Sequence, residues 1–311
     1  MNLIPVNNKN LYGYNEFFLS IKNMYENNKL PNKIIFSGSK GIGKSTFAYH
    51  IINFIFSLNE DCKYDFKNNI ISEENYSYNL IKKSTHPNFF LISSDDEKSN
   101  SQISQVREMI DFTNKSSFNN NSKIILIDNV EKLNLNSINA LLKIIEEPND
   151  DVFFFLIHDS KIKIIDTINS RCIKFNLFLN NDQKIKIFDK LINKNFYSSL
   201  NEDFKNIYNN PGDLVLLYNF FNENNIDEKI SIDEFLKLLI SKSLFKKSAY
   251  IKSNLSYFIE LFFIKKIYLL NSNNSIHNIC KYFLEKISNC NKYNLDIENV
   301  LIEFNGKMLN G

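Results

Sequence analysis

The first half of the chain alternates short, continuously apolar runs with longer segments in which apolar residues recur at helical spacing. Such alternation is typical of an α/β fold, and runs without polar interruption indicate strands that are covered on both faces. Five runs predict the strands of one parallel sheet, at residues 33–37, 89–92, 123–128, 152–157 and 172–175. Before the fourth of these runs, residues 136–147 predict a helix that ends at Pro148.

After about residue 177 the strand signals cease, and the apolar residues keep helical spacing to the end of the chain. Residues 179–222 predict a small helical domain, in which Pro211 and Gly212 are expected to break the pattern near its end. A further all-α domain is expected over residues 223–311, with helices at 231–241, 249–270, 276–288 and 295–309. The chain is therefore predicted to contain three domains, at 1–178, 179–222 and 223–311.

Composition excludes a few functional classes. The net charge is +2, so no global basic field indicates nucleic acid. The apolar stretch at 255–270 contains charges and is shorter than the roughly 20 apolar residues that a membrane span needs. We expect a cytoplasmic protein without membrane contact and, because no cysteines stand at metal-binding spacing, without a zinc site. The cysteines are Cys62, Cys172, Cys280 and Cys290.

Arginine is the unusual residue of this composition. Only Arg107 and Arg171 occur, whereas Asn, Lys, Ile and Phe, which have A/T-rich codons, dominate the chain. An arginine in such a sequence suggests a task that lysine cannot perform, and planar, bidentate recognition of phosphate oxygens is the obvious candidate. An ordinary surface ion pair explains Arg107 well enough.

A complete phosphate loop, G-x-x-x-x-G-K-S, occupies residues 38–45 between the first predicted strand and a helix-like stretch. Backbone N–H groups of such a loop converge on a phosphate at the positive end of the helix. The residues expected to bind ATP are Gly38, Gly41, Gly43, Lys44, Ser45 and Thr46. Asp128 ends the third apolar run, and its carboxylate would hold Mg²⁺ together with the Ser45 hydroxyl if nucleotide is bound.

The order of motifs resembles the bacterial DNA polymerase III clamp-loader subunits of the AAA+ class, and the delta-prime type most closely. After the phosphate loop come His86-Pro87, the strand ending in Asp128, the run N-A-L-L-K-I-I-E-E-P at 139–148 and T-I-N-S-R-C at 167–172. The last two motifs are highly specific together. The resemblance covers residues 11–178 well and 179–222 loosely.

This resemblance implies an AAA+ P-loop domain, a small helical lid and a helical collar that joins subunits. It implies as partners the gamma/tau ATPase subunits and the delta subunit of a pentameric loader, which places a sliding clamp on primed DNA. In such loaders the arginine of the S-R-C motif reaches into the ATP site of a neighbouring subunit. Arg171 is therefore expected to be a trans-acting arginine finger.

Departures from the family's hydrolysing pattern favour the delta-prime type. Where hydrolysing members carry a water-polarising Glu after the strand Asp, this chain has Asn129, and Glu131 is expected to point elsewhere. His158 replaces a polar Thr-like residue, and residues 209–214 contain no cation. We expect weak ATPase activity or none, and the alternative is a gamma/tau-type ATPase that uses Lys44, Ser45 and Asp128 in cis.

Three further residues have two interpretations each. His50 is expected to be a packing or surface residue rather than a ligand. His158 could contact nucleotide by its position, although an ordinary packing role is favoured. Lys143 could approach DNA phosphates, and a solvated helix face explains it about as well.

Overall fold

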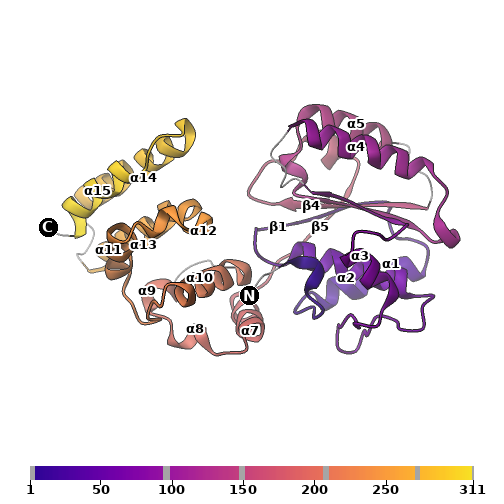
Figure 1. Cartoon of the computed structure of the whole chain (residues 1–311), viewed down its shortest axis with the longest axis horizontal. Helices are drawn as coiled ribbons and strands as arrows, with labels where there is room; N and C mark the ends of the chain where they lie inside the picture. The colour runs from indigo at the N-terminus through magenta and orange to yellow at the C-terminus, as the bar shows by residue number, and fades with distance from the viewer. Residues whose placement is uncertain (1–3, 94–98, 147–150, 206–209, 270–273, 310–311) are drawn as a thin grey trace. The chain divides into compact units, whose positions relative to one another are not determined.

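The computed structural model describes residues 4–93, 99–146, 151–205, 210–269 and 274–309 (Figure 1). The chain divides into two compact units. Unit 1 comprises Met1–Ile187 together with Asn210–Asp213, and unit 2 comprises Phe188–Asn209 together with Leu214–Gly311. The predicted division into three domains stays a prediction.

Unit 1 is built on a five-stranded, fully parallel sheet in the order β2-β3-β4-β1-β5. The predicted α/β class is confirmed. Because β1 lies between β4 and β5, the loop that leaves β1 emerges among the carboxyl ends of its neighbours, where open α/β sheets bind ligands. The strands are β1 (Lys33–Gly38), β2 (Phe89–Ser93), β3 (Lys123–Asp128), β4 (Val152–Asp159) and β5 (Ile173–Asn176).

Helices cover both faces of this sheet (Figure 1). Adjacent residues of a strand point to opposite faces, so Phe155 packs in the core on one side and Phe154 in the core on the other. One face carries α1 (Asn15–Glu26), α2 (Lys44–Ser57) and α3 (Tyr76–Lys82), and the other carries α4 (Ser99–Asn114) and α5 (Leu135–Glu146). Shorter elements are η1 (Pro5–Asn7), η2 (Phe118–Asn120), η3 (Val130–Lys132) and α6 (Asp166–Asn169).

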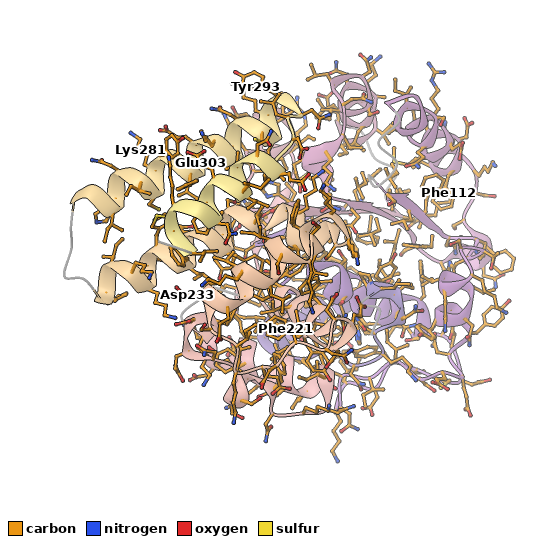
Figure 2. The ribbon with its side chains drawn as sticks, turned by 60° about the vertical axis from the view of Figure 1, so that its left-hand side comes forward. Phe112, Phe221, Asp233, Lys281, Tyr293 and Glu303 are labelled. Carbon is orange, nitrogen blue, oxygen red and sulfur yellow. The ribbon has the colours of Figure 1, made fainter. Side chains whose placement is uncertain are left out.

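In its described residues, unit 2 is helical. Its core is a chain of phenylalanine rings, in which Phe221, labelled in Figure 2, packs 5.5 Å from Phe235, and Phe235 lies 5.2 Å from Phe258. Residues from both predicted helical domains therefore share one core. The helices are α7 (Asn181–Ile192, which begins in unit 1), α8 (Phe196–Ser199), α9 (Glu202–Lys205), α10 (Pro211–Glu223, whose start belongs to unit 1), α11 (Ile232–Ser241), η4 (Leu244–Lys246), α12 (Ala249–Ser253), α13 (Leu255–Leu269), α14 (Asn274–Tyr293), α15 (Glu298–Phe304) and η5 (Asn305–Leu309).

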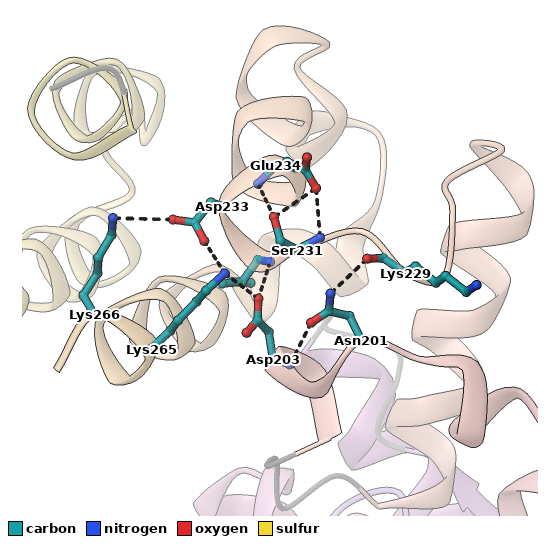
Figure 3. Close-up of polar contacts among 9 residues, drawn as sticks. Asn201, Asp203, Lys229, Ser231, Asp233, Glu234, Lys265 and Lys266 are labelled. Carbon is teal, nitrogen blue, oxygen red and sulfur yellow. Dashed lines mark hydrogen bonds and ion pairs between the residues drawn. The ribbon is translucent and has the colours of Figure 1, made fainter. Parts of the chain in front are cut away.

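An ion-pair network joins three helices of unit 2 (Figure 3). The Nζ atom of Lys265 on α13 lies 2.8 Å from a carboxylate oxygen of Asp203 on α9 and 2.6 Å from one of Asp233 on α11. Beside it, Ser231 and Glu234 form a reciprocal capping box at the start of α11. The network is half buried, so loss of Lys265 would leave two carboxylates without their shared cation.

Two expectations about helices were wrong. Pro211 and Gly212 do not break a helix but begin α10, because a proline at the first helical position lacks only an N–H group that has no partner within the helix. The single helix expected at 249–270 is interrupted at Asn254. The Asn254 side chain donates a hydrogen bond to the Tyr250 carbonyl and thereby ends α12.

Candidate functional site

The phosphate loop lies between β1 and α2, so its residues meet the N-terminal end of a 14-residue helix. Gly38 is required at the start of the loop. A Cβ atom there would lie 2.6 Å from the Leu177 carbonyl oxygen and 2.5 Å from the Ile42 side chain. On the other side of the loop, the buried Tyr14 hydroxyl donates a hydrogen bond to the Ile42 carbonyl at 2.9 Å. The loop is therefore held on two sides by its own unit.

Lys44 is turned into this loop. Its Nζ atom donates hydrogen bonds to the carbonyl oxygens of Gly38 at 2.8 Å and of Ser39 at 2.9 Å. Burial lowers the pKa of Lys44, and the carboxylates of Asp159, Glu131 and Asp128 act in the opposite direction. The ammonium group thus stabilises the loop from within and lies in the field of three acidic side chains.

Ser45 and Asp128 meet as the sequence predicted. The Ser45 hydroxyl donates a hydrogen bond to Oδ1 of Asp128 at 3.2 Å, so a hydroxyl and a carboxylate converge beside the loop. Mg²⁺ prefers such oxygen ligands, and these two residues fit the metal of a bound nucleotide. Thr46 differs from the other loop residues, because its hydroxyl accepts a hydrogen bond from the Asn8 side chain at 3.3 Å.

The turn after β3 corrects the expectation for Glu131. Asn129 adopts a left-handed conformation with φ 53°, which asparagine tolerates better than most residues. The chain therefore does not continue as a strand, and Oε2 of Glu131 accepts a hydrogen bond from the Asp159 backbone N–H at 3.3 Å. Glu131 and Asp159 thus lie near Lys44, and sequence reasoning missed both. An asparagine directly after a buried strand is the signal that would have suggested the turn.

The start of α10 is docked on the phosphate loop. The Asn210 side chain donates a hydrogen bond to the Lys40 carbonyl at 2.6 Å, and the Gly212 N–H donates one to the Gly41 carbonyl at 2.9 Å. A Cβ atom on Gly212 would lie only 3.0 Å from the Gly41 backbone. Asp213 lies against Gly41, and burial raises the pKa of its carboxyl group.

Sequence reasoning noted only that this segment contains no lysine or arginine. Asn209, which the prediction included, lies outside the described residues. Composition alone could not show that this segment contacts the loop through the backbone N–H of Gly212.

His50 is a buried structural residue. Its Nδ1 atom lies 2.9 Å from the Tyr64 hydroxyl, and its Nε2 atom donates a hydrogen bond to the Asn8 carbonyl at 2.9 Å. Burial lowers the pKa of His50 to about 4. The ring therefore stays neutral at pH 7 and fixes the same N-terminal segment that contacts Thr46.

His158 also has both ring nitrogens in internal hydrogen bonds. They contact the Ser37 hydroxyl at 3.0 Å and the Ile162 carbonyl at 2.9 Å, which favours the packing interpretation over a nucleotide contact. Lys143 and Arg107 are exposed on α5 and α4, respectively, as a solvated helix face requires.

Arg171 lies at the other edge of the sheet. It stands in the turn before β5, and Cys172 beside it is close enough to Lys33, the first residue of β1, for that charge to act on the thiol. Gly38 is the last residue of the same six-residue strand, which spans about 20 Å. The structure therefore brings Lys44, Ser45 and Asp128 together and places Arg171 apart from them.

Arg171 is partly exposed, with 36% of its side chain accessible. Its Nη2 atom lies 2.7 Å from Oε1 of Glu146, and its Nη1 atom donates hydrogen bonds to the Thr167 carbonyl at 3.0 Å and to the Ser170 hydroxyl at 3.4 Å. The guanidinium group is thus held at the surface by the residues around it.

The described residues contain no group of three or more His, Cys, Asp or Glu side chains suited to hold a metal ion. Among the same residues, no helix is both long and apolar enough to cross a membrane. A Mg²⁺ ion at Ser45 and Asp128 would therefore depend on the phosphates of a nucleotide for its other ligands.

Comparison with known proteins gives consistent matches. A family model described as DNA polymerase III, delta subunit, matches residues 13–180. The DNA polymerase III subunit delta' of Buchnera aphidicola subsp. Baizongia pistaciae is 36% identical over 156 residues, covering 49% of this chain and 45% of that protein. The subunit gamma of Buchnera aphidicola subsp. Acyrthosiphon pisum is 31% identical over 185 residues, covering 59% of this chain and 48% of that protein.

The matched segments thus span about half the length of these curated relatives. Among solved structures, a DNA polymerase III gamma subunit-related protein from Thermotoga maritima aligns with 94% of this chain and 98% of its own. Its sequence identity to this chain is 16% and the TM-score is 0.47.

Proposed function

The chain belongs to the delta-prime-type family of DNA polymerase III clamp-loader subunits, and we propose that it supplies Arg171 to the ATP site of a neighbouring subunit. In this proposal the chain assembles with gamma/tau-type ATPase subunits and a delta subunit. The assembled loader places a sliding clamp on primed DNA. The chain's own site binds ATP weakly or not at all.

The position of Arg171 carries this proposal. It lies near the amino end of β1, whereas the phosphate loop begins at the carboxyl end of the same strand. An arginine that recognises the γ-phosphate must reach within hydrogen-bonding distance of it, which Arg171 cannot do toward its own loop. Its side chain is accessible, so a phosphate on another subunit is the target that the geometry favours.

The phosphate loop supports the second half of the proposal. Lys44 donates to the loop's own carbonyl groups, and the start of α10 binds the loop from outside. Asn129 offers an amide where water activation needs a base. If ATP binds, Ser45 and Asp128 would hold its Mg²⁺, which would neutralise phosphate charge.

Hydrolysis by a reconstituted loader tests this function. Arg171→Ala should lower ATP hydrolysis at the neighbouring site by a factor on the order of 10³ or more, as loss of an arginine finger does elsewhere. Lys44→Ala should leave that rate unchanged. A loader that keeps its full rate with Arg171→Ala would exclude the proposed role.

A gamma/tau-type ATPase remains the second candidate, because the loop is complete, Ser45 meets Asp128, and Glu131 lies nearer to Lys44 than the sequence suggested. The purified chain, assayed alone with primed DNA and clamp, separates the two. We expect no turnover. Turnover that Lys44→Ala abolishes would establish the second candidate instead.

A further inference from the structure

Glu146 and Arg171 join two of the sequence motifs through a polar contact at the surface. Glu146 belongs to the N-A-L-L-K-I-I-E-E-P run and is the last residue of α5, whereas Arg171 belongs to the S-R-C motif before β5. Their side chains form an ion pair of 2.7 Å between Oε1 and Nη2. The pair lies at the surface, since half of the Glu146 side chain is accessible.

Helix stability does not explain a carboxylate at this position. The C-terminal end of a helix carries partial negative charge, so a glutamate in its last position is mildly unfavourable. Exposed ion pairs also contribute little to folding. What Glu146 does contribute is an anchor for a side chain that otherwise samples many rotamers.

The remaining contacts fix the orientation of the guanidinium plane. Nη1 is held by the Thr167 carbonyl and the Ser170 hydroxyl, and Nη2 is held by Glu146. Arginine has five N–H donors, and in the described part of the chain only Nη1 of Arg171 donates hydrogen bonds, while Nη2 is engaged by the ion pair. The N–H group on Nε is therefore a donor that a phosphate can recruit.

We propose that Glu146 is a positioning residue for Arg171: its carboxylate and the Thr167 carbonyl hold the guanidinium group in one orientation at the surface, with its remaining donors available to the γ-phosphate of the neighbouring subunit. This inference rests on the proposed function. It assigns Glu146 no contact with nucleotide and lets it act only through Arg171.

The first test is ATP hydrolysis by the reconstituted loader. Glu146→Ala should lower kcat at the neighbouring site roughly 5- to 30-fold, because Arg171 must then be ordered in each catalytic cycle, and should leave the KM for ATP unchanged. Glu146→Gln, which keeps an oxygen acceptor, should lie between wild type and Glu146→Ala. Glu108→Ala, at an exposed glutamate on α4, is the matched control and should have no effect.

A double variant tests whether Glu146 acts through Arg171. Arg171→Ala and Arg171→Ala/Glu146→Ala should hydrolyse ATP at the same rate. A further loss in the double variant would show that Glu146 acts in another way and would overturn the inference. A rate that rises with Glu146→Ala would also overturn it, since Glu146 would then restrain Arg171 rather than position it.

A measurement on the chain alone separates this inference from the proposed function. With only two arginines, ¹⁵N-arginine labelling gives two sets of guanidinium NMR signals, and Arg107 serves as the internal reference. The Arg171 set should show slowed rotation of its NH₂ groups, and Glu146→Ala should remove this slowing while Glu146→Gln should reduce it.

Slowed rotation combined with an inert Arg171→Ala in the loader would refute the proposed function and leave the pairing intact. An Arg171 that already rotates freely in the wild-type chain would refute the positioning role, whatever Arg171→Ala does in the loader.

Discussion

The carboxyl and amino edges of the sheet in unit 1 each carry a positively charged side chain, and the surroundings of the two side chains differ. At the carboxyl edge, which we call the enclosed edge, carbonyl groups of the phosphate loop accept hydrogen bonds from Lys44, Asn210 and Gly212, while the Lys40 side chain of the loop is exposed. At the amino edge, Arg171 is exposed and is held by Glu146 with donors to spare. Lys44 is thus engaged within the loop, whereas Arg171 lies at the surface.

In the proposed function, this difference explains how a complete nucleotide motif can coexist with little ATPase activity of the chain's own. A motif specifies which groups are present, whereas the contacts around them decide how they are held, and in this loop the described contacts engage Lys44 and carbonyl groups. In the same proposal, the accessible arginine is the group that acts on a partner subunit.

The largest expected effect is that of Arg171→Lys. Lysine keeps the positive charge but lacks the planar fork, so it cannot both hold Glu146 and engage a phosphate. We expect hydrolysis at the neighbouring site to fall by a factor on the order of 10³ in single-turnover measurements on the loader. Arg107→Lys, at the other arginine, is the control and should match wild type. Equal rates for both variants would mean that charge alone suffices and would remove the contrast between the edges.

Acid should destabilise the core around α2, the helix that follows the phosphate loop, because His50 is buried there. The pKa of His50 is about 4 in the folded chain, below its ordinary value, so the unfolded chain binds the proton first as the pH falls. The stabilisation due to neutral His50 is therefore complete above about pH 6.5 and is lost between there and pH 4. His50 alone should account for about 2 kcal/mol of unfolding free energy lost between pH 7 and pH 5, and His86, whose pKa burial also lowers to about 4, adds to the loss. Urea unfolding followed by circular dichroism at both pH values measures this change.

His50→Gln should remove this part of the pH dependence, whereas His277→Gln, at an exposed histidine on α14, should retain it. If wild type and His50→Gln lose the same unfolding free energy on acidification, His50 does not contribute to the acid sensitivity of the chain.

Much of the fold could be predicted because it follows from patterns along the chain. The apolar run that ends in Asp128 is β3 as predicted, and the helix expected at 231–241 is α11, whose first turn is fixed by the capping box of Ser231 and Glu234. Such elements depend on periodicity and on side chains a few residues apart. The phosphate loop is a local motif of the same kind, and the meeting of Ser45 with Asp128 was predicted from the order of motifs in P-loop proteins.

The parts that could not be predicted depend on single backbone conformations or on distant contacts. The left-handed Asn129 redirects Glu131, and no periodicity reports one residue's φ angle. The contact between Gly212 and Gly41 joins segments about 170 residues apart through backbone atoms, which leave no composition signal. The pairing of Glu146 with Arg171 requires knowing which strand ends are neighbours.

Gly38→Ala should damage the enclosed edge and leave the other intact. The added Cβ atom would lie 2.6 Å from the Leu177 carbonyl oxygen, a backbone atom that cannot move aside freely. We expect a loss of about 2 kcal/mol in the free energy of unfolding, within the range of overpacking substitutions. Gly306→Ala is the control, because no atom lies within 4 Å of its added Cβ. A Gly38→Ala chain as stable as the control would show that the loop adjusts readily and is not rigidly enclosed.

The smallest effect is expected from Asp213→Asn. In the proposed function the loop binds nucleotide weakly, and this substitution tests whether the charge of Asp213 is the reason. The amide keeps the shape of the carboxyl group and can still accept the hydrogen bond from the Asn210 backbone. Burial raises the pKa of Asp213, and Asp159 adds to this while Lys40 and Lys161 oppose it.

Removing this charge should therefore stabilise unit 1 by less than about 1 kcal/mol and strengthen MgATP binding about 3- to 5-fold, since one negative charge no longer faces the phosphates. Calorimetric titration of the chain with MgATP measures the affinity, and Asp111→Asn on the exposed face of α4 is the control. Unchanged affinity would assign the weak binding to Lys44 and its carbonyl partners instead of to the charge of Asp213. Weaker binding would mean that Asp213 supports the nucleotide, and the carboxyl edge would then be a working site rather than an enclosed one.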